Sequence, residues 1–213
     1  MRPTARCALT AVMLCLGGCN LVVSQTPMFT KADAAGAPVI RAGVWRQDVA
    51  GCDFDETQPQ SQWPQCAGAT PAMPDPPPLL TVAGDPAIMQ VSMPPDPSKP
   101  TLLYLYAAFR PVRFDAKGRV VAVKTWLVQC GPPATGQDAM NISKSPLPGL
   151  TPQGKGGGCT PQSVAALRGA AKASEAWIQG QTPFSHWVRD PKPGDLTGPI
   201  AAAAAAEAPA SKP

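Results

Sequence analysis

The sequence predicts an α+β fold: a small antiparallel β-sheet with a long central hairpin at about 101–129, followed by a C-terminal helix at about 161–180. Three observations lead to this class. The hairpin residues are rich in strand formers on both sides of a glycine turn. Thr160 and Pro161 are typical of the first positions of a helix. The 28 prolines and 19 glycines among 213 residues exclude a mostly helical bundle, because proline breaks helix interiors.

Residues 1–18 have the composition of an export signal. Arg2 and Arg6 precede a ten-residue apolar run, and two small residues, Gly17 and Gly18, follow it. This order is that of a secretory signal peptide, and the run is too short to span a bilayer. We therefore expect residues 1–18 to be a signal peptide that the mature protein lacks.

The end of this segment resembles the lipobox of bacterial lipoproteins, since Leu16, Gly17 and Gly18 precede Cys19. The resemblance implies cleavage before Cys19, diacylation of its thiol and, usually, acylation of the new amino group. Several acyl chains anchor a protein stably to a membrane. Asn20 stands where an aspartate would favour the inner membrane, so we expect the outer membrane, with the protein facing the periplasm. An ordinary secreted protein is the alternative.

Four cysteines remain when those of the signal peptide and Cys19 are set aside: Cys52, Cys66, Cys130 and Cys159. An even number of cysteines in an oxidising compartment predicts two disulfides, with three possible connectivities. Their order along the chain favours Cys52–Cys66 and Cys130–Cys159, because each pair brackets one loop-like segment. Zinc binding is the competing hypothesis, but it lacks a Cys-x-x-Cys pair and a nearby histidine.

The mature chain divides into three parts by composition. Residues 19–39 are small and polar, with two prolines and no sustained period, so we expect a lipidated N-terminus followed by a tether. Residues 40–190 contain the strand and helix patterns and form the β-rich domain. Residues 191–213 include the six alanines at 201–206 and are expected to be a disordered Ala/Pro-rich tail.

Short strands are predicted around the long hairpin. The segments 39–46, 79–83 and 87–92 are strand-like, and a turn sequence at 84–86 separates the last two. A final short strand is predicted at 184–189.

The long hairpin itself has apolar residues on both faces, which predicts central strands covered on one side by a helix or a second sheet. Gly118 stands at the turn position where a positive φ is needed. Pro111 restricts the end of the first strand to an edge or a bulge.

No catalytic, cofactor-binding or metal-binding motif is recognisable. His186 is the only histidine and has no Gly-x-Ser-x-Gly partner, so we interpret it as a packing or capping residue. The acidic segment around Asp53 and Asp55 departs from the EF-hand pattern. We therefore assign no catalytic residue, no metal ligand and no cofactor.

The charge balance does not indicate a nucleic-acid partner. Loss of Arg2 and Arg6 leaves 16 basic against 14 acidic side chains, and the basic residues are scattered. The expected partners are the membrane, through the lipid anchor, and an envelope protein or cell-wall component.

Several tryptophan and cysteine motifs are similar to those of uncharacterised exported proteins of alphaproteobacteria. They are Gly43-Val44-Trp45, Cys52-Asp53-Phe54-Asp55, Trp63-Pro64-Gln65-Cys66-Ala67, Trp126, Cys130-Gly131-Pro132-Pro133 and Trp187-Val188-Arg189. The resemblance covers about residues 40–190 and implies no catalytic residue.

Together these observations predict a cell-envelope lipoprotein whose domain is a non-enzymatic binding or structural module. The alternative is an envelope hydrolase with paired carboxylates, which the fourteen acidic residues neither support nor exclude. Two acids converging in a deep pocket would favour the hydrolase. An exposed apolar patch carrying Trp63 or Tyr104 would favour the binding module.

Overall fold

The computed structural model describes residues 20–67, 79–93, 103–133, 146–153, 158–177, 184–192 and 195. The predicted signal peptide, the predicted lipidation site Cys19 and residues 196–213 of the predicted tail lie outside the described residues. Within the described part of the chain, no helix has both the length and the apolar character needed to cross a membrane.

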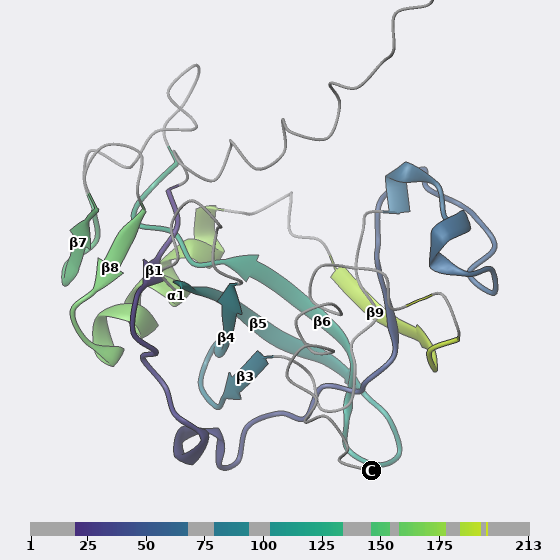
Figure 1. Cartoon of the computed structure of the whole chain (residues 1–213), viewed down its shortest axis with the longest axis horizontal. Coiled ribbons are helices and arrows are strands. Elements are labelled where there is room, and N and C mark those ends of the chain that lie inside the picture. The colour runs from purple at the N-terminus through teal and green to yellow at the C-terminus, as the bar shows by residue number, and fades with distance from the viewer. Residues whose placement is uncertain are drawn as a thin grey trace, which may run out of the picture.

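The fold is built on a seven-stranded antiparallel sheet (Figure 1). Its strands are β1 (Val23–Ser24), β2 (Val44–Gln47), β3 (Leu79–Val82), β4 (Ala87–Met93), β5 (Leu103–Phe114), β6 (Val120–Leu127) and β9 (Phe184–Arg189). Six of them follow the order β2-β9-β6-β5-β4-β3, and β1 pairs with β5.

The remaining elements lie around this sheet. They are the β7 (Leu150–Pro152) and β8 (Cys159–Pro161) hairpin, the helix α1 (Val164–Trp177), and the 3₁₀ turns η2 (Lys31–Ala34), η3 (Gln60–Gln62) and η4 (Gln65–Ala67). The fold is therefore mostly β, rather than the α+β class that the sequence predicted, because α1 is the single α-helix among the described residues. Its 14 residues pack against a much larger sheet.

The predicted central hairpin is confirmed. β5 and β6 pair from Phe114 and Val120 near the turn to Ala107 and Leu127 at the open end. Gly118 has a φ of 74° in the turn, where L-residues with a Cβ are disfavoured. The register shifts just after Pro111, as expected for a residue that has no N–H to donate to the ladder. The flanking strands predicted at 79–83, 87–92 and 184–189 are β3, β4 and β9.

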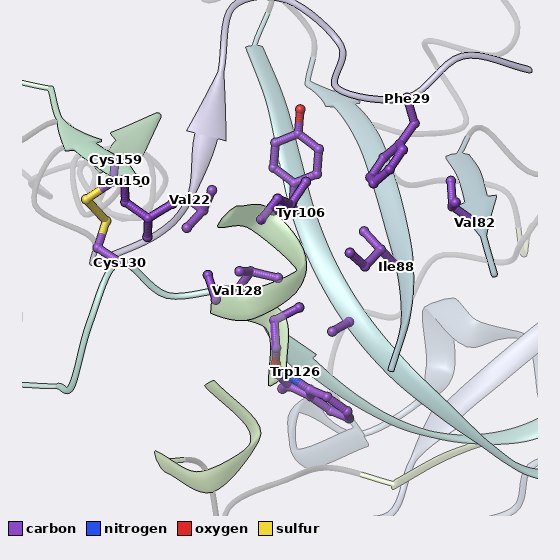
Figure 2. Packing of buried hydrophobic residues seen from close by; sticks show 14 residues of the cluster. Val22, Phe29, Val82, Ile88, Tyr106, Trp126, Val128, Cys130, Leu150 and Cys159 are labelled. Carbon is purple, nitrogen blue, oxygen red and sulfur yellow. Dashed lines mark hydrogen bonds between the residues drawn. A yellow bond between two sulfur atoms is a disulfide. The ribbon is translucent and has the colours of Figure 1, made fainter. Parts of the chain in front are cut away.

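Each face of the sheet carries a buried cluster. On one face, α1 and the N-terminal segment cover Ile88, Tyr106 and Trp126 (Figure 2). The Trp126 indole also donates a hydrogen bond to the Ala171 carbonyl oxygen of α1, at 2.9 Å. On the other face, Phe109 is packed with residues of β2, β6 and the segment before β2. The sheet therefore has a second core, which no α-helix covers among the residues that the structure describes.

Helix α1 begins later than predicted, at Val164 rather than 161. Thr160 and Pro161 are not its first residues because they belong to β8 and pair with β7. Ser163 caps the helix instead, since its hydroxyl oxygen accepts a hydrogen bond from the Ala166 N–H at 3.1 Å. The predicted end at 180 lies outside the described residues.

Glu175 ties α1 to the central hairpin. Its carboxylate accepts hydrogen bonds from Arg110 Nε at 2.9 Å and from Lys124 Nζ at 3.2 Å. These two cations, Arg110 first, hold the pKa of the Glu175 carboxyl below its usual value. The half-buried Glu175 side chain thus joins α1 to β5 and β6 through two ion pairs, in addition to the buried residues of the helix.

The predicted tether is wrong for the part of it that the structure describes. Val23 and Ser24 form β1, which is hydrogen-bonded to the first residues of β5. Val22 is fully buried, and Phe29 is only 3% exposed. Residues 20–39 are therefore part of the folded domain, which was predicted to begin at residue 40.

Polar partners explain how a segment without a regular apolar period folds. The Ser24 hydroxyl and the Tyr106 hydroxyl are 2.6 Å apart and hydrogen-bonded in the core. The Phe29 backbone N–H donates to Gln90 Oε1, and its carbonyl oxygen accepts from Gln90 Nε2, both at 3.0 Å. One buried glutamine side chain thus replaces a strand partner for this residue.

Both predicted cysteine pairs are confirmed at disulfide distance. The Cα atoms of Cys52 and Cys66 are 5.8 Å apart, and those of Cys130 and Cys159 are 5.6 Å apart. The first pair closes a loop next to β2. The second pair is fully buried and joins the chain after β6 to β8 (Figure 2).

Replacement of Phe29 by alanine tests whether the N-terminal segment is part of the folded domain. We expect Phe29→Ala to lower the free energy of unfolding by about 3 kcal/mol, because it empties a buried site. Thr26→Ala is the control: this side chain is exposed, and we expect a change within about 0.5 kcal/mol. Urea denaturation followed by circular dichroism measures both values. Equal stabilities would mean that the segment is a tether after all.

Candidate functional site

A cluster of acid and base side chains lies beside the first disulfide. His186 is on β9, Asp48 follows β2, and Glu56 is in the loop that Cys52 and Cys66 close. Arg46 and His186 face each other in the register of β2 with β9, and the Asp48 N–H continues this pairing with a hydrogen bond to the Phe184 carbonyl oxygen. The pairing of β2 with β9 thus brings the cluster together.

The two carboxylates lie at the two nitrogens of one imidazole ring. His186 Nδ1 is 2.7 Å from Asp48 Oδ1, and His186 Nε2 is 3.8 Å from Glu56 Oε1. The Arg46 guanidinium forms a salt bridge with Glu56, and it also donates a hydrogen bond to the Cys52 carbonyl oxygen. His186 therefore lies between two carboxylates, whereas the sequence suggested a packing or capping residue.

These contacts limit the chemistry of the cluster. A general base or a nucleophile needs an atom that can reach the substrate. Here both imidazole nitrogens face carboxylates, and Glu56 is paired with Arg46. The geometry fits a clamp that holds the loop against β2 and β9.

A second ion pair fastens the same loop from the other side. Asp195 is 1% exposed, and its Oδ1 accepts a hydrogen bond from Arg189 Nη2 at 3.0 Å. The Asp195 carboxylate also accepts from the backbone N–H groups of Gln60 at 3.0 Å and Lys192 at 2.6 Å. The prediction of a disordered tail from 191 onward is therefore wrong at residue 195.

Arg189 completes this connection. Its guanidinium donates to the carbonyl oxygens of Glu56 at 3.2 Å and Gln58 at 2.8 Å. The hydrogen bond from Arg189 is the main cause that lowers the pKa of the Asp195 carboxyl well below its ordinary range. Asp195, a charged residue in a segment without a strand or helix pattern, is thus a buried attachment point for the loop.

Two of the motifs that carried the resemblance, Gly43-Val44-Trp45 and Trp187-Val188-Arg189, lie side by side on β2 and β9. The Trp187 indole donates to the Ala42 carbonyl oxygen at 3.0 Å, and the Arg41 guanidinium lies 3.3 Å from the centre of a Trp187 ring. Gly43 has a φ of 134°, and a Cβ at this position would lie 2.3 Å from Trp187 Nε1. Glycine is required here by both the backbone conformation and the close approach of the ring.

Trp63 and Tyr104 do not form a shared surface. Trp63 stays within the disulfide loop, where its ring centre lies 5.0 Å from that of Phe54 and its indole donates to the Gln58 carbonyl oxygen. Tyr104 is half-buried and packs against the cluster under α1. The described surface does carry an exposed apolar patch, but other residues form it.

This patch, the open apolar face, lies on the side of the sheet opposite to α1. Its members are Val23, Leu79, Met89, Val91, Met93, Leu103, Leu105 and Leu127. They share one face because residues directly opposite in antiparallel strands point to the same side, and residues alternate along each strand. Val91, for example, pairs with both Leu79 and Leu105, and Leu105 also pairs with Val23.

The open apolar face is accessible to solvent. Leu103 is 37% exposed and Leu127 is 42% exposed, while the other six members are partly exposed. None of the eight residues is charged. The alternating apolar residues of 87–93 and 103–109 are consistent with such an exposed face. They fit equally well a face that is buried by a second sheet.

No known family model, curated protein or solved structure matches this chain. Among the residues that the structure describes, no group of three or more His, Cys, Asp or Glu side chains is placed to hold a metal ion.

Replacement of Asp195 by asparagine tests the buried attachment of the loop. We expect Asp195→Asn to lower the free energy of unfolding at pH 7 by about 3 kcal/mol, because it leaves Arg189 without its partner. Hydrogen exchange at the Gln60 amide, which donates to Asp195, should become faster. Asp190→Asn is the matched control, since the Asp190 side chain is 80% exposed, and its effect should be within about 0.5 kcal/mol.

The pH dependence of the same variant has a defined sign. The pKa of Asp195 is lowered in the folded state, so its stabilising effect is complete above the unfolded pKa of about 4 and is lost as the pH falls below it. The difference in stability between wild type and Asp195→Asn should therefore shrink between pH 5 and pH 2. A difference that stays constant over this range would contradict the ion pair.

Replacement of Gly43 by alanine separates backbone strain from steric contact. Gly51 also has a positive φ, 76°, but a Cβ there would meet nothing within 4 Å. We expect Gly51→Ala to cost about 1 kcal/mol of stability, and Gly43→Ala to cost clearly more because of the contact with Trp187. Thermal or urea denaturation gives both values, and equal costs would mean that the indole moves away freely.

Proposed function

We propose that this chain is a lipid-anchored protein of a bacterial cell envelope, attached through an acylated Cys19 and facing the periplasm from the outer membrane. Its mostly β domain acts as a binding or structural module rather than as an enzyme. One observation carries the proposal: the lipobox-like sequence ends immediately before a domain that contains two disulfides. Disulfides persist in oxidising compartments such as the periplasm.

The surroundings of Asn20 support the proposed anchor position. The Asn20 side-chain amide donates a hydrogen bond to the Gly131 carbonyl oxygen at 2.7 Å, and the Asn20 backbone carbonyl oxygen accepts one from the Cys130 N–H at 3.0 Å. Cleavage before Cys19 would therefore keep Asn20 and both of these hydrogen bonds.

The role as a binding module is supported by the contrast between the two surfaces. The acid and base groups beside the first disulfide are engaged with one another, whereas the open apolar face presents uncharged side chains to its surroundings. Exposed apolar patches of this kind mark interaction sites.

The alternative hydrolase would use Asp48 and Glu56 as its paired carboxylates, and both now face His186. Release of soluble fragments from cell-wall polymer by the purified chain, lost in both Asp48→Asn and Glu56→Gln, would favour it.

The mass of the mature N-terminus tests the anchor. We expect the wild-type protein to begin at Cys19, to carry the mass of its acyl chains and to sediment with membranes, because several chains give stable anchoring. Cys19→Ser should remove the lipid and leave the protein in the soluble envelope fraction. Cys15→Ser is the control, since it changes a cysteine of the signal segment and keeps the lipobox. An unmodified Cys19 in the wild type would overturn the proposal.

A further inference from the structure

We infer that the open apolar face lies against the surface of a lipid bilayer in the anchored protein. This inference rests on the proposed function, because it requires an acylated Cys19. It adds an orientation: the side of the sheet opposite to α1 is turned toward the membrane.

The first argument is the distance between the anchor and the face. Val23 is a member of the open apolar face and is four residues from Cys19, so their Cα atoms are at most about 14 Å apart. The residues between them are held in place: the Val22 N–H donates to the Val128 carbonyl oxygen at 2.8 Å, and Asn20 is 8% exposed. Acyl chains on Cys19 are therefore kept near this part of the domain.

The second argument is the chemistry of the face. Its eight members are all apolar, and Leu103 and Leu127 are the most exposed of them. Apolar side chains gain free energy when they leave water for the boundary between headgroups and acyl chains. A charged side chain in the same position would oppose this transfer.

The third argument is the contrast with the other surfaces. The side covered by α1 carries Arg110, Lys124 and Glu175. The far end of β5 has two exposed apolar residues, Val112 and Phe114, but it lies about 36 Å along the strand from Leu103. Charged residues, among them Arg113 and Lys117, also stand beside it. The open apolar face combines apolar character with closeness to the anchor.

Photolabelling from the lipid tests the orientation. The mature lipidated protein is reconstituted in vesicles of phosphatidylethanolamine and phosphatidylglycerol with a diazirine-bearing phosphatidylcholine, illuminated, digested and mapped by mass spectrometry. We expect label at residues 103–107 and 123–129 at about ten times the level at residues 110–120. Label mainly at 110–120, or none on the domain, would overturn the inference.

Two paired variants make the test specific. The double variant Leu103→Ser/Leu127→Ser should lose most of the label on the face, whereas Val112→Ser/Phe114→Ser, the matched control at the far end of β5, should keep it. Circular dichroism establishes that both variants are folded. Unchanged labelling of the first variant would contradict the inference. The inference would also be contradicted if a bound envelope protein, rather than lipid, covered the open apolar face.

The mass of the N-terminus separates this inference from the proposed function. A lipidated protein with the wrong labelling pattern overturns the orientation alone. An unmodified Cys19 overturns the proposed function as well.

Discussion

The fold depends on how the first residues of β5 satisfy their backbone hydrogen bonds. β5 begins at Leu103, but its pairing with β6 extends only to Ala107. On that edge, the first residues of β5 therefore need another strand to satisfy their backbone hydrogen bonds. β1 is this partner, and it pairs with β5 on the same edge that β6 occupies further along the strand (Figure 1). The same segment is bridged to Gln129 and Cys159, so a strand of two residues connects the hairpin to β8. It adds to the direct links between α1 and the sheet, which are made by Trp126 and Glu175.

This connection divides the molecule into two ends of different character (Figure 1). At the end with β1 and β8, burial dominates: Val22, Cys130 and Cys159 are all fully buried. At the end with β2 and β9, ion pairs and charged hydrogen bonds add to the buried core, since the loop closed by the first disulfide is held by Arg46 and Arg189. Burial is insensitive to pH, whereas carboxylate ion pairs weaken in acid. The loop end should therefore loosen first on acidification.

Whether a feature could be predicted from the sequence depends on how far apart its interacting residues are along the chain. The hairpin around Gly118 and the pairing of the cysteines depend on neighbours along the chain, and both were predicted correctly. The tether, the helix start and the tail were wrong because Phe29, Pro161 and Asp195 each find partners distant in sequence or in another element. Gln90 and Arg189 give no local sign that they will bind these segments. The open apolar face was not predicted for the same reason: its members come from five strands.

A fold that includes residue 20 changes what a lipid at Cys19 would do. A flexible tether of twenty residues lets a domain sample many heights and orientations above a membrane. A lipid attached next to Asn20 acts on a backbone that is already hydrogen-bonded to residues 130 and 131, so anchoring also restricts rotation. The β2 and β9 end, with Arg41 stacked on Trp187, then lies across the sheet from β1 and β8 (Figure 1). Under the proposed orientation, a partner in the periplasm would meet the side covered by α1, which carries Arg110, Lys124 and Glu175.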